Sequence, residues 1–324
     1  MQPVKLFTFL VLTLFFTPDL IGQVQLGSTI QDPDSIARIG WTIEFSHDGQ
    51  RMVVGAPNAS TLDWLAGKVL VYDLVDGEWV QVGQTLYGQQ SSDYFGTYLS
   101  MSADGLRFAV GVRNVGNMDI PGQIITYELQ NGQWDTLGQI LTVGTEDWAG
   151  ASVQLSADGN RLAAFVEDEN EEDVVQAYEF DGETWQPLAA PITAGSSFRF
   201  QSALVMSADG GTLAVNGTDN SNFWRFKVYR LQGEQWVQLG STVASSGDWD
   251  LFGWSMSLSS DGNRIAVGSP GANDNGADSG NATVWEFTDG DWQQVGSNIA
   301  GESIRDETGY SVSLAGNGQR LVVG

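Results

Sequence analysis

The stretch Ser152-Val-Gln-Leu-Ser-Ala-Asp-Gly-Asn-Arg-Leu-Ala163 decides the fold, because the chain repeats it. Close copies begin at Ser255 and Ser311, and looser copies surround the Asp-Gly pairs at 48, 104 and 209. The residues before the marker glycines stand at 48, 104, 158, 209, 261 and 317, with spacings of 51 to 56 residues. A constant period of this size is typical of architectures in which one supersecondary unit stacks against the next.

Each unit divides into four short strands. An alternating first strand, such as 152–156, ends at the marker pair, and a second strand such as 264–268 follows directly. A third strand, such as 68–72, leads through a second pair such as Asp76-Gly77 into a fourth strand. Because Asp-Gly and Asn-Gly favour type I′ hairpins, we expect such turns at both places in each unit. The fourth strands open with a tryptophan, at Trp79, Trp134, Trp185, Trp236 and Trp292.

Four antiparallel strands in about 54 residues describe a propeller blade. The predicted fold class is therefore all-β, a β-propeller of four-stranded antiparallel blades with repeats of about 54 residues. The domain 23–324 would hold five complete units from about 40 to 308 and a partial unit at 309–324. We expect the five tryptophans to pack between blades, since one small sheet cannot bury both faces alone. No helical period appears after the first 22 residues.

The N-terminal segment 1–22 has the pattern of a signal peptide. Lys5 precedes an 11-residue, largely apolar run, and Gly22 offers a cleavage point before Gln23. Eleven residues are too few to cross a hydrocarbon core of roughly 30 Å, and no later stretch is apolar enough to do so. The predicted localisation is therefore secreted or cell surface, after cleavage, with no membrane span.

Segment 24–30 resembles 237–243, which is the fourth strand of the fourth unit. We therefore predict an orphan outer strand at 24–30, belonging to a blade that the other end of the chain completes. The sequence stops after the second strand of the sixth unit, so we expect a chain truncated at its C-terminus. The total number of blades stays open.

Charge and residue types restrict the chemistry. The net charge is −26, with 14 basic and 40 acidic residues, which disfavours nucleic acid and anionic lipid as partners. The chain has no cysteine, and its only histidine, His47, occupies a repeat position that holds Ala103, Ala157 and Ala208 elsewhere. A position that accepts alanine does not carry catalysis, so nucleophile–histidine mechanisms and zinc sites lack their residues. We predict a protein that is not an enzyme, although the many acids leave a carboxylate pair open.

The repeats resemble FG-GAP repeats, the blades of the integrin α-subunit propeller and of bacterial surface proteins. The resemblance rests on Phe95-Gly96 and Phe252-Gly253, and on Gly55-Ala-Pro57 with its variant Gly268-Ser-Pro270. An acidic residue three positions before the glycine recurs at Asp93, Asp147, Asp250 and Asp306. The resemblance spans nearly all of the mature chain and implies the propeller fold, usually with seven blades. It implies little about the ligand.

The integrin-type calcium loop, of the form D-x-D-x-D-G, is missing between the first and second strands. Each of these turns carries about one carboxylate, whereas calcium takes six to eight oxygens. We predict no cofactor, and no calcium at these turns. The acidic run Glu167–Asp173 and the polar segment Asn273–Asp278 leave calcium open elsewhere, although solvated loops and turn chemistry explain both.

Recognition is expected on the rim that carries the long connections, which differ between units, whereas the opposite rim carries stereotyped turns. Aromatic rings beside carboxylates and amides suit sugars or protein side chains, although the same rings also suit blade junctions. We predict a non-catalytic extracellular binding or adhesion module for a protein or glycan; the alternatives are a structural spacer and a carboxylate-dependent glycan hydrolase or lyase. The oligomeric state stays open. The candidate residues on this rim are Asp63, Trp64, Asp93, Tyr94, Asp147, Trp148, Trp224, Asp248, Trp249 and Asp250.

Overall fold

The structure is a computed structural model that describes residues 25–31, 34, 36–112, 121–144, 152–167, 172–245 and 250–324. These residues form strands, turns and loops without any helix, as the sequence predicts. The strands belong to five antiparallel sheets of one design and to a sixth sheet of two strands. No described helix offers the length and apolarity needed to cross a bilayer.

The first three sheets follow one another along the chain. The first sheet contains β1 (Thr42–Phe45), β2 (Arg51–Ala56), β3 (Lys68–Val75), β4 (Glu78–Gln81) and β5 (Leu86–Tyr87). The second contains β6 (Tyr98–Met101), β7 (Arg107–Val112), β8 (Gln123–Gln130), β9 (Gln133–Thr136) and β10 (Leu141–Thr142). The third contains β11 (Gln154–Leu155), β12 (Arg161–Glu167), β13 (Asp173–Phe180), β14 (Trp185–Pro187) and β15 (Ile192–Thr193).

The remaining sheets continue the same order. The fourth contains β16 (Phe198–Met206), β17 (Thr212–Asp219), β18 (Trp224–Gln232), β19 (Gln235–Gln238) and β20 (Val243–Ala244). The fifth contains β21 (Ser255–Leu258), β22 (Arg264–Ser269), β23 (Asn281–Thr288), β24 (Asp291–Gln294) and β25 (Ile299–Ala300). The sixth pairs β26 (Val312–Leu314) with β27 (Leu321–Val323).

Each complete sheet keeps four strand positions, with the outermost strand in two pieces. In the first sheet β4 and β5 both pair with β3, as Tyr72 with Gln81 and Lys68 with Tyr87. Gly83 lies between the two pieces with a positive φ of 72°, a conformation that a residue with a Cβ rarely adopts. The predicted fourth strand is therefore real but interrupted.

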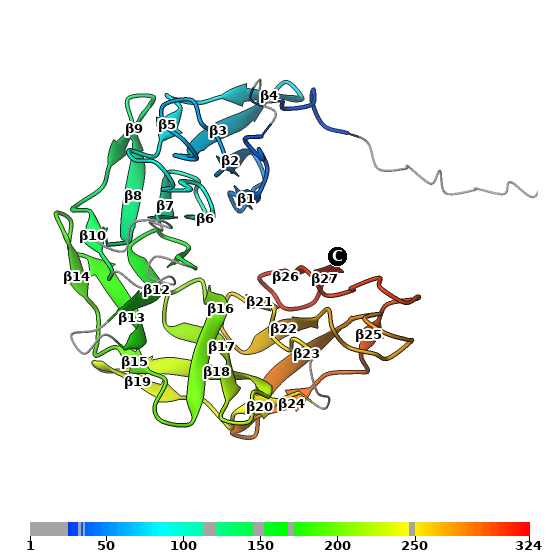
Figure 1. Ribbon diagram of the computed structural model, residues 1–324. Helices are drawn as coiled ribbons and strands as arrows, with labels where there is room; N and C mark the ends of the chain where they lie inside the picture. The colour runs from blue at the N-terminus through cyan, green and yellow to red at the C-terminus, as the bar shows by residue number, and fades with distance from the viewer. Residues whose placement is uncertain are drawn as a thin grey trace, which may run out of the picture.

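The sheets are the blades of a β-propeller. Figure 1 shows them side by side around a common axis, with β1 at one end of the arc and β26–β27 at the other. The innermost strands β1, β6, β11, β16, β21 and β26 contact one another in that order. Apolar side chains of adjacent sheets, such as Val53 with Phe108 and Leu162 with Ile124, form separate cores between the blades.

A chain of backbone hydrogen bonds joins the inner turns, the turns between the first and second strands of each blade. In every case the amide of one blade donates to the carbonyl of the next blade. The pairs are His47 to Ala103 (2.8 Å), Ala103 to Ala157 (2.7 Å), Ala157 to Ala208 (2.8 Å), Ala208 to Ser260 (3.0 Å) and Ser260 to Gly316 (2.8 Å). His47 therefore occupies the alanine position that the repeat predicts, where only its backbone is required.

The prediction of type I′ geometry is correct for some turns and wrong for others. The outer turns, between the third and fourth strands, have positive φ at both central residues in Asp76-Gly77, Asn131-Gly132 and Asp289-Gly290. At the inner turns only the glycine has positive φ, as at Gly49, so these turns are not type I′. The reason is that Asp48 accepts hydrogen bonds from the Ser46 hydroxyl and the Gln50 amide, which closes a different loop.

Trp134, Trp185, Trp236 and Trp292 pack between blades, as predicted, whereas Trp79 lies against Phe45 of its own blade and against Gly27. Trp134 and Trp185 are each 2% exposed and Trp292 is 4% exposed. The indole nitrogens of Trp134 and Trp292 donate to a carbonyl of the preceding blade, to Val82 at 3.0 Å and to Leu239 at 2.8 Å. The indole nitrogen of Trp236 is buried and has no hydrogen-bond partner among the described residues. Replacing a buried tryptophan by alanine typically costs about 3–5 kcal/mol, so these rings are major contributors to stability.

The predicted orphan strand at 24–30 is not a strand in the structure. Val24 lies outside the described residues, and 25–31 form no ladder with the strands of the described chain. The segment nevertheless packs on the first blade as a fourth strand packs on the next. A Cβ at Gly27 would lie 3.1 Å from the Trp79 ring, and the Ser28 amide donates to Glu78 at 2.7 Å.

Candidate functional site

The two rims of the propeller differ in their polar chemistry. On the turn rim, which carries the inner and outer turns, each inner turn of the five complete blades holds one aspartate in a closed network. The Ser46 hydroxyl donates to Asp48 at 2.7 Å and the Ser259 hydroxyl donates to Asp261 at 2.6 Å, and these bonds lower the pKa of both carboxyls. These carboxylates serve the turns themselves. Within the described ranges, no three His, Cys, Asp or Glu residues gather as a metal site.

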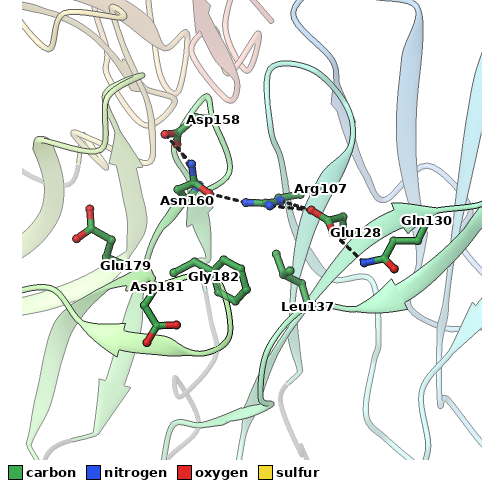
Figure 2. Close-up of a pocket in the computed structure, with 10 residues that line it drawn as sticks. Arg107, Glu128, Gln130, Leu137, Asp158, Asn160, Glu179, Asp181 and Gly182 are labelled. Carbon is green, nitrogen blue, oxygen red and sulfur yellow. Dashed lines mark hydrogen bonds and ion pairs between the residues drawn. The ribbon is translucent and has the colours of Figure 1, made fainter.

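A polar hollow of about 560 Å³ opens between the second and third blades on the turn rim. Figure 2 shows Arg107 at its centre, between Glu128 and Asn160. The Arg107 guanidinium lies 2.7 Å from Glu128 and also stands over the Phe180 ring at 5.5 Å. Since Arg107 is fully engaged by its own blade and the next one, this hollow is built as a blade junction.

The same arginine clamp recurs around the turn rim. Arg51 and Arg264 each pair with an acid of the third strand and donate to a glycine carbonyl of the next blade, at 3.0 Å in both cases. In the fourth blade Thr212 occupies the arginine position, and Arg230 of the third strand reaches Asn263 of the fifth blade instead. The repeated clamps make this rim structural.

On the loop rim, which carries the longer connections, four predicted site residues come together between the first and second blades. Asp63 accepts hydrogen bonds from the Ser91 hydroxyl and the Trp64 amide, both at 2.7 Å, and Trp64 is 63% exposed. Asp93 is only 4% exposed and holds the amides of two residues in its own loop; burial raises its pKa. Tyr94 adopts a positive φ of 47° and its amide donates to Leu65.

Two other predicted residues lie at the junction of the fourth and fifth blades. Trp224 is half-buried and packs against the apolar cluster that contains Phe226 and Phe252. Asp250 accepts a hydrogen bond from the Ser245 hydroxyl and lines a small hollow of about 90 Å³. The remaining four predicted residues, Asp147, Trp148, Asp248 and Trp249, lie outside the described residues.

The loop rim also carries a hollow that the sequence analysis did not identify, of about 240 Å³ between the fifth and sixth blades. The rings of Trp254 and Tyr310 lie 5.8 Å apart at 50° to each other, and they are 38% and 56% exposed. The exposed acidic residues Asp278 and Glu307 also line this hollow. The remaining lining residues are Leu251, Pro270 and Gly271.

The local backbone explains why these rings face outward. Leu251 has a φ of 56°, and the Trp254 amide closes a turn on the Leu251 carbonyl at 2.9 Å. Glu307 has a φ of 50°, and the Tyr310 amide closes the equivalent turn at 3.0 Å. Each ring therefore stands directly after the Gly253 or Gly309 position, at the start of an innermost strand. We name this group of Trp254, Tyr310, Asp278 and Glu307 the aromatic–acid hollow.

A sequence signal for this hollow exists, although it is weak. The residue after the glycine that precedes each first strand is aromatic at Trp41, Trp254 and Tyr310. All three rings are exposed in the structure. Their shared register would have identified them, whereas a search for acids beside aromatics led to other positions.

Comparison with known proteins supports the β-propeller fold and does not identify a function. No protein-family model matches the sequence, and no curated protein matches it. Sqt1 of Saccharomyces cerevisiae has a similar structure, with a TM-score of 0.55, 17% identity, and coverage of 87% of this chain and 67% of Sqt1. A putative 6-phosphogluconolactonase of Bacteroides fragilis has a TM-score of 0.51 and 15% identity, with coverage of 87% and 75%.

TolB of Acinetobacter baumannii has a TM-score of 0.47 and 15% identity, and covers 81% of this chain. This chain spans 56% of the length of that TolB. The structural neighbours are β-propeller proteins of unrelated activities. At these identities the likeness establishes a β-propeller fold, and function has to be argued from the site.

Proposed function

We propose that this protein is a non-catalytic extracellular binding module whose ligand docks on the loop rim, at the aromatic–acid hollow. The observation that carries the proposal is the pair of exposed rings at Trp254 and Tyr310, held by rigid turns beside two exposed carboxylates. Aromatic rings in a shallow hollow offer a large apolar contact, and the carboxylates orient a polar ligand.

The proposal of a module without catalysis is supported by how the other ionisable groups are used. The inner-turn acids serve their turns, the clamp arginines serve blade junctions, and His47 contributes its backbone to the axial hydrogen-bond chain. The extracellular location is supported by the leader pattern at 1–22. The partner would be an extracellular protein or glycan.

We also propose that the repeats are of the FG-GAP type. The glycines of such repeats allow the backbones of neighbouring blades to approach closely, and two contacts in the structure support this reason. A Cβ on Gly55 would lie 2.0 Å from the Gly96 carbonyl oxygen, and a Cβ on Gly268 would lie 2.0 Å from that of Gly309. The glycine of one blade thus accommodates the backbone of the next.

The test is a screen of the purified chain against glycan arrays and extracellular protein preparations, followed by alanine substitution of the two rings. Trp254→Ala and Tyr310→Ala are each expected to weaken binding about tenfold, as central aromatic contacts do. Trp41→Ala is the matched control, since Trp41 has the same register on the first blade. Equal unfolding midpoints would establish that the variants are folded. Binding that both ring variants leave unchanged would exclude this hollow as the site, whereas the absence of any ligand in the screen would favour a spacer role.

A further inference from the structure

The backbone around the aromatic–acid hollow has a counterpart in the same chain, at the junction of the first and second blades. Each residue of the counterpart stands 213 positions earlier, so Arg38 corresponds to Leu251 and Trp41 to Trp254. The backbone agrees at these positions. Arg38 and Leu251 have φ values of 54° and 56°, and both Trp41 and Trp254 donate an amide hydrogen bond to the residue three positions earlier.

The agreement extends to the loops that face these rings. Leu65 and Asp278 correspond, with φ values of 52° and 54°. Tyr94 and Glu307 correspond as well, with φ values of 47° and 50°. The two junctions therefore share one backbone frame and differ in the side chains attached to it.

In the first frame the chain supplies its own cation. The Arg38 guanidinium carbon lies 5.1 Å from the centroid of the Trp41 ring, within the range of a cation–π contact. In the second frame Leu251 replaces this arginine, and among the described residues no guanidinium covers Trp254. The position that a cation occupies beside one ring is left to a ligand beside the other.

The second frame also carries the charge to hold a cation. Asp278 and Glu307 replace Leu65 and Tyr94, which adds two carboxylates. Across the described part of the chain, no ion pair joins either carboxylate to an arginine or lysine. The net charge of −26 further attracts a cationic partner toward the surface.

We propose that the aromatic–acid hollow binds a guanidinium or ammonium side chain, presented by a basic segment of an extracellular protein. The cation stands over Trp254, in the place that Arg38 takes over Trp41, and pairs with Asp278 and Glu307. This inference rests on the proposed function and narrows its ligand. A neutral sugar would stack on the rings and leave the two carboxylates without a charged partner.

The first arm of the test compares two probes that differ only in charge. The pentapeptide Gly-Gly-Arg-Gly-Gly is titrated by calorimetry against the same peptide with citrulline, which is a neutral isostere of arginine. The arginine peptide is expected to bind about fivefold or more tightly, with an affinity that falls as salt increases. Equal binding of the two peptides would overturn the proposal.

The second arm fills the hollow from within. Leu251→Arg should place a guanidinium over Trp254 as Arg38 stands over Trp41, and weaken binding of the arginine peptide about fivefold. The backbone tolerates this substitution, since Arg38 adopts the same positive φ. Leu62→Arg is the control, because Leu62 is 67% exposed on another loop and the substitution changes the net charge equally. If both variants weakened binding of the arginine peptide equally, the change in net charge alone would explain the effect, and the proposal would be overturned.

The third arm separates failure of the inference from failure of the proposed function. Asp278→Asn and Glu307→Gln should each weaken the arginine peptide and leave any neutral glycan ligand unaffected. One outcome is a ligand that needs Trp254 for binding and yet binds equally well to Leu251→Arg, Asp278→Asn and Glu307→Gln. That result would support the binding module and refute the proposal that its ligand is a cation. If Trp254→Ala still bound every ligand of the natural protein, both the cation site and the binding role of this hollow would be refuted.

Discussion

The junction of the first and second blades and the junction of the fifth and sixth blades share a backbone and differ in side chains. At both junctions a glycine of one blade lies against the glycine of the next, Gly55 against Gly96 and Gly268 against Gly309. Above this contact the side chains diverge, as Leu65 and Tyr94 give way to Asp278 and Glu307. The repeat fixes the backbone contact and leaves the loop-rim side chains free to differ.

The junction of the fourth and fifth blades shows that the backbone contact can be made differently. Asn216 occupies the position of Gly55 and Gly268, and its buried side chain replaces a direct backbone approach. Its amide nitrogen donates to the Gly253 carbonyl at 2.9 Å, while its oxygen accepts from the Ala203 amide at 2.9 Å. A larger residue is therefore tolerated where its polar atoms replace the lost contact.

The largest effect is expected from filling the shared contact. Gly55→Ala and Gly268→Ala each place a Cβ 2.0 Å from a backbone oxygen, and neither the backbone nor a rotamer can relieve this cheaply. We expect each to lower the free energy of unfolding by about 3 kcal/mol, the upper part of the range for overpacking. Chemical denaturation measures it.

The control for this pair is Gly77→Asn at an outer turn, where nothing lies within 4 Å and asparagine tolerates the positive φ of 83°. We expect it to change stability by less than about 1 kcal/mol. A mild effect of either alanine variant would show that this junction relaxes, and the two junctions would then no longer share one frame.

The sequence predicts the parts of the fold that repeat. The period, the blade meander, the outer turns at Asp76 and Asn131, and the buried Trp134 all follow from copies of one pattern. The geometry of the inner turns was predicted wrongly, because it depends on a serine hydroxyl, such as that of Ser46, and the Asp-Gly pair alone does not indicate that serine.

The candidate site was predictable only as a rim. The sequence indicates that the longer connections share one edge of the blades, which the structure supports for the loops at Asp63 and Asp93. It does not indicate that Asp93 is buried by its own loop, or that Trp254 and Tyr310 converge from blades that lie 56 residues apart in sequence. Exposure and convergence depend on how the blades pack, and a single sequence carries little of that information.

The second prediction concerns a difference between the junctions at the innermost strands. Ser100 and Ser257 each accept an amide hydrogen bond from the next blade at 2.9 Å, whereas Glu44 takes the equivalent position on β1. Burial raises the pKa of Glu44 from an ordinary 4.5 to about 7. The folded state therefore holds this proton more tightly than the unfolded state does.

This sign makes the contribution of Glu44 to stability complete below about pH 4.5, and the contribution is lost as the pH rises through about 7. Glu44→Ser removes the titration and restores the hydroxyl found at Ser257. Between pH 5 and 8 we expect the natural protein to lose on the order of 1–3 kcal/mol relative to the variant. Unfolding free energies at the two pH values test this, with Ser257→Ala as a variant whose loss is independent of pH. Parallel pH profiles for the natural protein and Glu44→Ser would contradict the assignment.

The smallest effect is expected from giving the junction of the first and second blades the side chains of the junction of the fifth and sixth blades. The variant Arg38→Leu, Leu65→Asp, Tyr94→Glu, Thr97→Tyr gives the first frame the side chains that the second frame carries at the corresponding positions. Since the backbones agree, Trp41 should then accept a cation from solution, and a second site for the arginine peptide should appear. An exposed cation–π contact contributes about 0.5–1 kcal/mol, so the new site should be weaker than the original and raise the calorimetric stoichiometry toward two. Omitting Arg38→Leu from the set should prevent the gain, because the internal guanidinium still covers the ring. A second site that appears with Arg38 in place would show that the ring is not where the cation binds.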